Sequence, residues 1–265
     1  MITFPNAKIN IGLTVTGKRA DGFHNLHSVF YPIPLRDALE IIPSDEFIFT
    51  CTGFEAGNDK DNLCIKAYNL LKQKYDLPPV NIHLHKAIPA GSGLGGGSSD
   101  AAFTLKLLNT KFDLSLSDNE LSGFASSLGS DCPFFIQNKP CLATGRGEIL
   151  EPLNLDLSRY SILIIHPGIH INTAEAFSEI EICLPGPEYD ITSLPVEQWK
   201  GVVINDFEKI VEKKHPQILE LINTLYHHCA LYASMSGSGS AVYGIFETKA
   251  DLPKFPGHYF IKWID

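Results

Sequence analysis

A short run containing five glycines and three serines constrains this chain more than any other stretch. The run consists of Pro89, Ala90, Gly91, Ser92, Gly93, Leu94, Gly95, Gly96, Gly97, Ser98 and Ser99. Glycine lets backbone N–H groups approach a ligand without obstruction by a Cβ atom. The preceding residues 80–88 alternate like a half-exposed strand, and apolar residues at helical spacing follow from Ala101. We therefore predict a strand, a glycine loop and a helix, a context in which the N–H groups of the loop and of the helix start bind phosphate.

The loop fits the common nucleotide-binding patterns poorly. It is not a Walker loop, because no Gly-Lys-Ser/Thr sequence closes it. Gly91-x-Gly93-x-x-Gly96 matches the dinucleotide fingerprint, but the acid required about 20 residues later has only Asp113 or Asp118 as candidates. A flexible surface loop is the alternative interpretation. The helix that follows argues against it, because Ser98 or Ser99 is a suitable N-cap.

Length, charge and cysteine usage limit the class of protein. The chain has 265 residues, which allows one large domain or two small ones. Its net charge of −9 is opposite to that of a general nucleic-acid binder, and no apolar run approaches the ~20 residues of a membrane span. The six cysteines are scattered without a C-x-x-C pair, which favours reduced thiols in a cytoplasmic protein. We expect neither nucleic acid nor a membrane as a partner.

Hydrophobic periodicity and turn signals predict a mixture of strands and helices. A capping box of Ser117 and Glu120 begins one helix, which we expect to end near Gly129, and Pro216 begins another. The predicted strands are 8–15, 26–31, 38–42, 80–88, 160–166, 231–235 and 241–246. Further helices are predicted at 62–75, after the glycine loop and at 205–211, with a hairpin at 142–150. A domain boundary is predicted near Glu151-Pro152.

Three motifs in order along the chain resemble those of the GHMP kinases, the galacto-, homoserine, mevalonate and phosphomevalonate kinases. They are Ala7-Lys8-Ile9-Asn10, the glycine loop with Asp100-Ala101-Ala102, and Ser234-Met235-Ser236-Gly237-Ser238-Gly239-Ser240. Arg19-x-Asp21-Gly22-Phe23-His24, Gly129-Ser130-Asp131-Cys132-Pro133-Phe134-Phe135 and Asn205-Asp206-Phe207-Glu208 add to the resemblance. It implies an α+β fold with an N-terminal ATP-binding domain like ribosomal protein S5 domain 2, over 1–152. It also implies a ferredoxin-like GHMP kinase domain over 153–265.

The resemblance implies a phosphoryl-transfer site with Asp131 as general base and Lys8 as its partner. A lysine there would neutralise charge that develops on the transferring group. Residues 89–99 would wrap the phosphates of ATP, and the hydroxyl of Ser98 or Ser99, with Ser99 as the candidate ligand, would help to hold Mg²⁺. Asn62 and Lys86 would lie near the adenine. The alternatives are an ordinary N-cap aspartate for Asp131 and solvated strand lysines for Lys8 and Lys86.

The resemblance also implies a site for a cytidine ring. Phe23 and His24 follow a turn, and the family places an aromatic ring there against the base, with the histidine bonding to the edge of the base. Phe177 matches the second ring of this sandwich, although it also suits a helix core. Asn10 shares one face of its strand with Lys8 and would contact the substrate or Asp131. The Gly237–Ser240 turn closes the site or is only a tight hairpin.

The resemblance therefore implies an ATP- and Mg²⁺-dependent small-molecule kinase. Its acceptor would be the 2-hydroxyl of a methylerythritol that carries a cytidine diphosphate group, in the non-mevalonate route to isoprenoid precursors. We expect a cytoplasmic monomer or weak homodimer. The alternatives are a GHMP kinase acting on homoserine or a mevalonate, and a non-catalytic nucleotide-binding sensor. Phe23, His24 and Phe177 argue against the first, and the presence of both Lys8 and Asp131 argues against the second.

Overall fold

The computed structural model describes residues 1–54, 61–180, 182 and 190–264. These residues form two compact units that interleave along the chain. The first comprises residues 1–8, 32–90 and 95–139, and the second comprises residues 9–31, 91–94 and 140–265. This division differs from the single boundary predicted after residue 152. The reason is that residues 9–31 belong to two long strands, and Leu13 in the first of them exchanges backbone hydrogen bonds with Ile204 and Asp206, far beyond residue 152.

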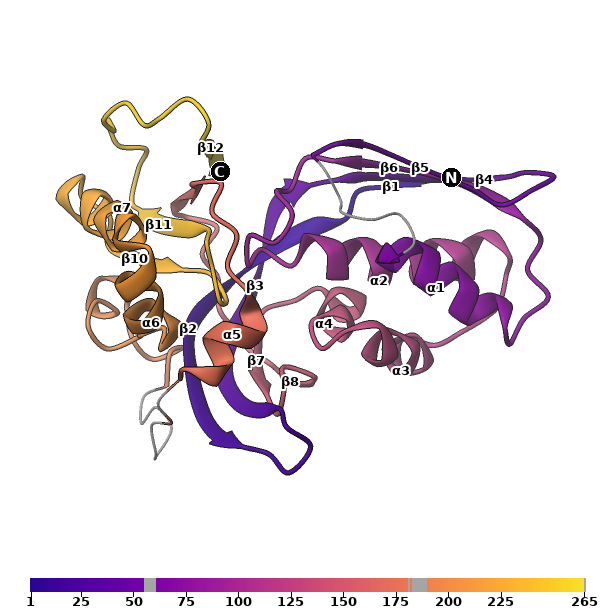
Figure 1. Ribbon diagram of the computed structural model, residues 1–265, viewed down its shortest axis with the longest axis horizontal. Helices are drawn as coiled ribbons and strands as arrows, with labels where there is room; N and C mark the ends of the chain where they lie inside the picture. The colour runs from indigo at the N-terminus through magenta and orange to yellow at the C-terminus, as the bar shows by residue number, and fades with distance from the viewer. Residues whose placement is uncertain (55–60, 181, 183–189, 265) are drawn as a thin grey trace. The chain divides into compact units, whose positions relative to one another are not determined.

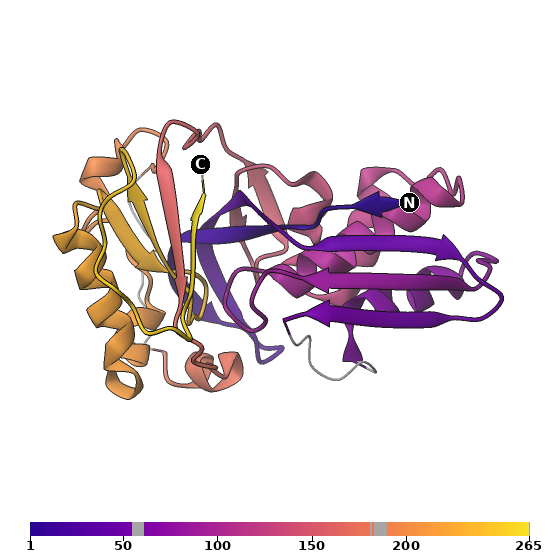
Figure 2. The ribbon, with the colours of Figure 1, turned by 90° about the horizontal axis from the view of Figure 1, so that it is seen from above.

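The first unit is built on a four-stranded sheet with helices on one face (Figure 1). The sheet order is β1-β4-β6-β5, with β5 parallel to β6 and the other neighbours antiparallel. Helices α1 and α2 lie under the sheet, and α3 and α4 pack on α2. The elements are β1 (Ile2–Thr3), β4 (Ala38–Pro43), β5 (Ile48–Gly53), β6 (Val80–Lys86), α1 (Leu63–Lys72), α2 (Gly96–Lys111), α3 (Asp118–Leu128) and α4 (Cys132–Gln137). Figure 2 shows the sheet from above, with β4, β6 and β5 side by side.

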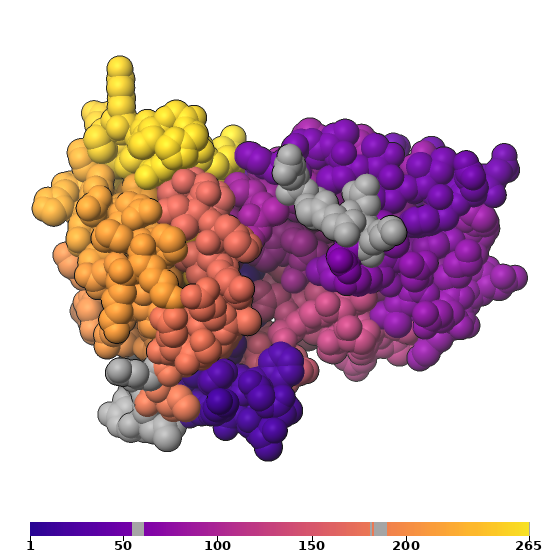
Figure 3. All heavy atoms as spheres, in the orientation of Figure 1, coloured from indigo at the N-terminus to yellow at the C-terminus, as the bar shows by residue number. Residues whose placement is uncertain are grey.

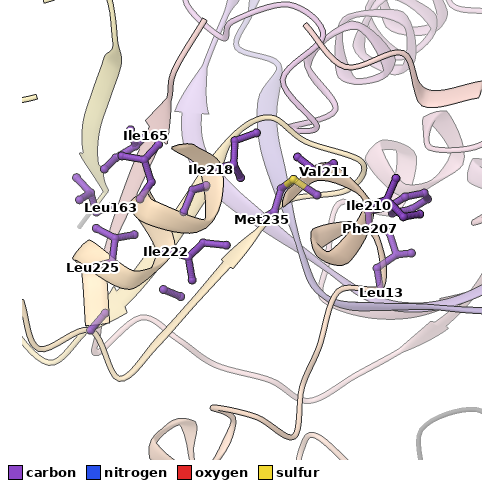
Figure 4. Close-up of a cluster of buried hydrophobic side chains, with 14 of the residues drawn as sticks. Leu13, Leu163, Ile165, Phe207, Ile210, Val211, Ile218, Ile222, Leu225 and Met235 are labelled. Carbon is purple, nitrogen blue, oxygen red and sulfur yellow. The ribbon is translucent and has the colours of Figure 1, made fainter. Parts of the chain in front are cut away.

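The second unit contains a sheet of order β10-β11-β9-β12 and the helices α5, α6 and α7. The apolar faces of α6 and α7 pack on this sheet around Leu163, Leu225 and Met235 (Figure 4). The elements are β9 (Ser161–His166), α5 (Thr173–Ser178), α6 (Phe207–Lys214), α7 (Pro216–His227), β10 (Tyr232–Met235), β11 (Val242–Phe246) and β12 (Phe260–Ile264). The mostly exposed residues before β12 form the yellow surface beside α7 in Figure 3.

The third sheet has the order β2-β3-β7-β8 and contains the longest strands of the chain. Its strands are β2 (Asn6–Lys18), β3 (His24–Arg36), β7 (Cys141–Thr144) and β8 (Ile149–Pro152). The predicted hairpin at 142–150 is the β7–β8 pair. Gly12 has φ +64°, a left-handed conformation that interrupts the regular alternation of β2 and favours glycine.

Most of the predicted elements are confirmed, with corrections at their ends. The capping box of Ser117 and Glu120 begins α3, and Pro216 begins α7. The predicted N-cap at Ser98 or Ser99 is wrong, because α2 already begins at Gly96 and its N-cap is Gly95, with φ +72°. Strands β1, β5 and β12 have no counterpart among the predicted strands. Residues 183–189, which include Pro185 and Pro187, lie outside the described residues.

The cysteines and helices bear on two of the expectations from composition. Five of the six cysteines are described and all five are free thiols; Cys64, Cys132 and Cys141 are buried, whereas Cys229 is exposed. Cys183 lies outside the described residues. No helix in the described ranges has both the length and the apolar character needed to cross a bilayer.

The Asn205–Glu208 motif fixes α6 to the neighbouring strands. The Glu208 carboxylate accepts hydrogen bonds from the Ser234 hydroxyl at 2.7 Å and from the Met235 N–H at 2.8 Å. Asp206 accepts one from the Val15 N–H at 2.9 Å. Burial raises the pKa of Glu208, although the two donors act in the opposite direction. The motif that carried part of the family resemblance therefore has a structural role within the second unit.

We predict that Glu208→Gln changes how stability depends on pH. A carboxyl whose pKa is raised in the folded state stabilises the fold while it is protonated, and this contribution is lost as pH rises above the ordinary value of about 4.3 through the raised value. The free energy of unfolding of the unchanged protein, relative to the glutamine variant, should therefore fall between pH 4 and pH 8. Urea denaturation at both pH values measures it, and a difference that stays constant or rises would contradict the prediction.

Candidate active site

The structure brings Lys8 and Asp131 into direct contact within the first unit. Lys8 lies near the start of β2, and Asp131 immediately precedes α4. The Lys8 Nζ and Asp131 Oδ2 atoms are 3.2 Å apart. The Lys8 side chain is 3% exposed and that of Asp131 is 32% exposed, so a buried ammonium lies behind a carboxylate that solvent can reach. Such a carboxylate can accept a proton from a substrate, with a cation fixed beside it.

The N-terminus of α2 packs against this pair. A Cβ atom at Gly95 would lie 3.0 Å from Phe135 Cζ and 3.1 Å from Lys8 Cγ, and the φ of +72° disfavours any other residue. The first N–H groups of a helix have no acceptor within the helix and carry the positive end of its dipole. The start of α2 therefore offers anion-binding groups next to Lys8.

The two serines at the start of α2 differ in their surroundings. The half-buried Ser98 forms a hydrogen bond with the thiol of Cys132, the residue that follows Asp131. Ser99 is fully buried, and its hydroxyl has no hydrogen-bond partner among the described residues. The position of Ser98 on the Asp131 side makes it a better candidate than Ser99 for the predicted metal ligand.

Lys86 does not occupy the exposed position that a nucleotide contact requires. It is 4% exposed, and its Nζ contacts Asp37 Oδ2 and, at 2.7 Å, Asp100 Oδ2. Burial alone would lower the pKa of Lys86, but the Asp100 and Asp37 carboxylates raise it. Burial also raises the pKa of Asp100, and the nearby Asp37 carboxylate acts in the same direction. The contact predicted between Lys86 and adenine is therefore not favoured by its position.

Asn62 serves as the N-cap of α1. Its Oδ1 accepts a hydrogen bond from the Cys64 N–H at 2.9 Å. The cap uses one lone pair of the carbonyl oxygen, so a contact with a nucleotide would come from the amide nitrogen or from the second lone pair. The cap role is a sufficient local reason for an asparagine at this position.

In the second unit, Asn10 is held by several hydrogen bonds. Its Nδ2 donates to Ser28 Oγ at 2.9 Å, and its backbone N–H donates to Ser236 Oγ at 3.2 Å. The Tyr243 hydroxyl donates to the backbone oxygen of Asn10 at 2.8 Å. These bonds orient the Asn10 amide so that its Oδ1 faces Gly237, where a Cβ atom would approach it to 3.3 Å. Sequence reasoning identified Asn10 but not Ser28 or Tyr243.

The first half of the glycine loop packs on the turn between β10 and β11. Ser236 Oγ donates to the Gly93 carbonyl at 2.9 Å, and the Ala241 N–H donates to the Ser92 carbonyl at 2.9 Å. A Cβ atom at Gly93 would lie 2.0 Å from the Ser236 carbonyl oxygen, so only glycine fits. Asn205 also fixes the turn, because its Nδ2 donates hydrogen bonds to the Met235 and Gly237 carbonyls at 2.8 Å each. The Ser236–Ser240 motif is therefore more than a hairpin: it holds one end of the loop.

The predicted aromatic sandwich differs from the observed arrangement. Phe177 stacks on the imidazole of His24, with ring centroids 5.2 Å apart and an interplanar angle of 18°, and contacts Phe207 edge to face. Phe23 is 52% exposed, and the guanidinium of Arg146 lies 4.8 Å from its ring centroid. Sequence reasoning placed Arg146 only within the predicted hairpin at 142–150, and the charge of Arg146 was the one signal that could have indicated this contact.

Comparisons with known proteins show which family this chain belongs to. The family description "GHMP kinases N terminal domain" matches residues 62–139, and "GHMP kinases C terminal" matches residues 197–255. The chain is 53% identical over 262 residues to a 4-diphosphocytidyl-2-C-methyl-D-erythritol kinase of Bacteroides thetaiotaomicron, covering 96% of this chain and 95% of the relative. A protein of the same name from Porphyromonas gingivalis is 47% identical over 266 residues, with coverages of 96% and 95%.

Solved structures give the same result. A crystal structure of 4-(cytidine 5'-diphospho)-2C-methyl-D-erythritol kinase matches with a TM-score of 0.79 and 31% identity, covering 92% of this chain and 90% of the other. The mevalonate kinase of Methanococcus jannaschii matches with a TM-score of 0.69 and 14% identity, covering 93% and 90%, and supports the fold alone. The chain belongs to the GHMP kinases, and the expected α+β architecture of that family is confirmed. The two bacterial relatives and the first of these structures are named as kinases of a cytidine diphosphate-linked methylerythritol.

We predict opposite effects on stability for two glycine-to-alanine substitutions in the first unit. Gly95→Ala should lower the free energy of unfolding by about 1–3 kcal/mol, because the methyl group meets Phe135 and Lys8 and the backbone is left-handed. Gly123→Ala, in α3 with no atom near the added Cβ, should raise it by about 0.5–1 kcal/mol. Urea denaturation measures both. A Gly95→Ala protein as stable as the unchanged one would show that the packing around Lys8 is not tight.

Proposed function

We propose that this chain transfers the terminal phosphoryl group of ATP to the 2-hydroxyl of 4-diphosphocytidyl-2-C-methyl-D-erythritol, in the non-mevalonate route to isoprenoid precursors. The observation that carries the proposal is the 3.2 Å contact between Lys8 Nζ and Asp131 Oδ2 beside the N-terminus of α2. Relatives at 47–53% identity carry the name of this kinase. We expect the enzyme to work in the cytoplasm as a monomer or weak homodimer.

In this proposal Asp131 orients the acceptor hydroxyl and takes its proton. The solvent-accessible carboxylate suits this role, because a base must come within hydrogen-bond distance of the proton that it removes. Lys8 lies behind Asp131 and offsets negative charge at the transferring group. Because the Lys8 side chain packs beside Gly95 and Phe135 and is paired with Asp131, little reorganisation is needed when substrate binds.

The phosphates of ATP would bind to backbone N–H groups at the start of α2 and in the glycine loop. The donors lie next to Lys8, so the negative charge of the nucleotide is met by an ammonium and by a helix dipole. This local positive potential explains how a chain with a net charge of −9 can bind a polyphosphate.

The oxygen donors at this site fit a magnesium ion held mainly by the nucleotide. Mg²⁺ takes oxygen ligands, keeps several waters and needs few protein ligands when phosphates are present. The Ser98 hydroxyl, on the Asp131 side, suits such a ligand, whereas the enclosed Ser99 hydroxyl does not. When bound, the ion would neutralise charge that develops on the phosphates.

The cytidine ring would bind against Phe177. A base inserted between two parallel rings needs about 7 Å between them, or two ordinary contact distances. The 5.2 Å spacing of His24 and Phe177 is too small, so His24 must leave the ring of Phe177 when the base stacks there. The displaced imidazole could then form hydrogen bonds with the edge of the base.

We predict that Asp131→Asn lowers kcat about 10²- to 10⁴-fold, because the general base is lost. ADP affinity should stay within about threefold, since the anion-binding groups are unchanged. A coupled assay of ADP release and calorimetric titration with ADP measure the two quantities. Asp118→Asn, which changes an exposed acid at the start of α3, is the matched control and should leave both unchanged. Normal turnover by the Asp131 variant would remove the proposed base.

We predict that Phe177→Leu raises the KM for the cytidyl substrate about tenfold, with a smaller change in kcat, because base stacking is lost. CDP should inhibit the unchanged enzyme competitively and the variant less. Phe255→Leu, a partly buried phenylalanine outside these motifs, is the control. ADP release with homoserine or a mevalonate, without inhibition by CDP, would favour the rival kinases instead. ATP binding without ADP release on any acceptor would favour the sensor.

A further inference from the structure

Three buried charged side chains meet behind the glycine loop, and the proposed chemistry uses none of them. Asp37 joins β3 to β4, Lys86 is the last residue of β6, and Asp100 lies in the first turns of α2. They are 1%, 4% and 2% exposed. No ligand in an open site can reach groups this enclosed, so any effect on nucleotide binding must pass through the segments that they connect.

The Asp37–Lys86–Asp100 cluster forms hydrogen bonds with the chain segments on both sides of the glycine loop. Asp37 Oδ1 accepts the N–H groups of Ala87 at 2.6 Å and Ile88 at 2.8 Å, the first two residues after β6. Its other oxygen contacts Lys86 Nζ, which also donates to Asp100 Oδ2 at 2.7 Å. The segment that enters the loop and the helix that leaves it are therefore fixed to the same ammonium.

The first residue of α2 packs directly on the cluster. A Cβ atom at Gly96 would lie 3.1 Å from Lys86 Nζ and 3.0 Å from Ile88 Cγ2. The N-terminus of α2 therefore has no room to shift towards β6 without displacing the ammonium. The angle at which the first N–H groups of α2 point depends on this contact.

Stability alone is a poor explanation for such a cluster. Burying an ammonium and two carboxylates carries a desolvation cost that apolar side chains of similar volume would avoid. The cost is not fully offset, because Asp100 Oδ1 is buried and has no hydrogen-bond partner among the described residues. Charge-assisted hydrogen bonds do, however, fix orientation more tightly than apolar packing.

We propose that Asp37, Lys86 and Asp100 are positioning residues that set the geometry of the phosphate-binding loop without touching the nucleotide. The proposal rests on the proposed function only in taking the ligand of the loop to be the phosphates of ATP. This role and a direct contact between Lys86 and adenine predict different effects on the affinities of ligands with and without phosphates. Loop geometry matters for ADP and ATP, which carry phosphates, and not for adenosine, which has none.

Calorimetric titration of Asp100→Asn and Gly96→Ala with adenosine and with ADP tests the proposal. Asp100→Asn removes one carboxylate without a change in shape, and Gly96→Ala presses a methyl group against Lys86. Each should weaken ADP binding about tenfold, the effect of about one charged hydrogen bond, and leave adenosine binding within about twofold. Asp37→Asn, which keeps an oxygen for the two N–H groups but loses its charge, should act in the same direction.

Two controls separate positioning from general effects. Lys66→Met breaks an exposed ion pair with Asp61, and Leu105→Ala removes a buried apolar side chain further along α2 and leaves the three charged side chains of the cluster in place. Neither control substitution should change the ratio of the ADP affinity to the adenosine affinity. Equal weakening of adenosine and ADP binding by the cluster variants would assign Lys86 a direct contact with the base. Unchanged affinities for both ligands would make the cluster purely structural. Either result overturns the proposal.

The same titrations distinguish this proposal from the proposed function, since they contain no acceptor. An unchanged enzyme that binds ADP but does not phosphorylate the cytidyl substrate would refute the proposed function alone. The selective loss of ADP affinity would still support the positioning role. If the unchanged protein does not bind ADP, both proposals fail.

Discussion

The proposed chemistry depends on the ion pair between Lys8, near the start of β2, and Asp131. The Lys8 ammonium is buried behind the Asp131 carboxylate. A buried cation needs an anion, and Asp131 Oδ2 supplies one at 3.2 Å. The N-terminus of α2 can lie against the same lysine only because residue 95 is a glycine. A base, a cation and a set of N–H donors thus share one small region of the first unit. Phosphoryl transfer requires this combination more than it requires any single residue.

The two halves of the glycine loop need glycine for different reasons. Gly93 belongs to the second unit, where its backbone meets the Ser236 carbonyl too closely for a side chain. Gly95 belongs to the first unit, where a left-handed backbone and the Lys8 side chain exclude a Cβ atom. Asn205 and Glu208 hold the β10–β11 turn that supports the first half. The Asp37–Lys86–Asp100 cluster supports the approach to the loop and the helix after it. Each half of the loop is therefore held by contacts within its own unit.

Local signals in the sequence predicted the parts of the fold that depend on neighbouring residues. The Ser117–Glu120 capping box, the proline at the start of α7 and the alternation in β6 all describe interactions within a few residues. The resemblance to a family brought Lys8 and Asp131 together, which spacing alone could not do. Sequence reasoning missed the environment of Lys86, because Asp37 and Asp100 lie 49 and 14 residues away along the chain. It also missed Arg146 over Phe23, a contact that depends on how the β7–β8 hairpin lies beside the start of β3.

The most direct test of the account is a crystal structure with a non-hydrolysable ATP analogue and the cytidyl acceptor both bound. If Asp131 is the base, the acceptor hydroxyl oxygen lies within about 2.6–3.2 Å of an Asp131 carboxylate oxygen. The account also predicts that the terminal phosphate contacts Lys8 and the first N–H groups of α2. A hydroxyl held by another side chain, with Asp131 still paired to Lys8 but away from the substrate, would contradict the assignment of the base.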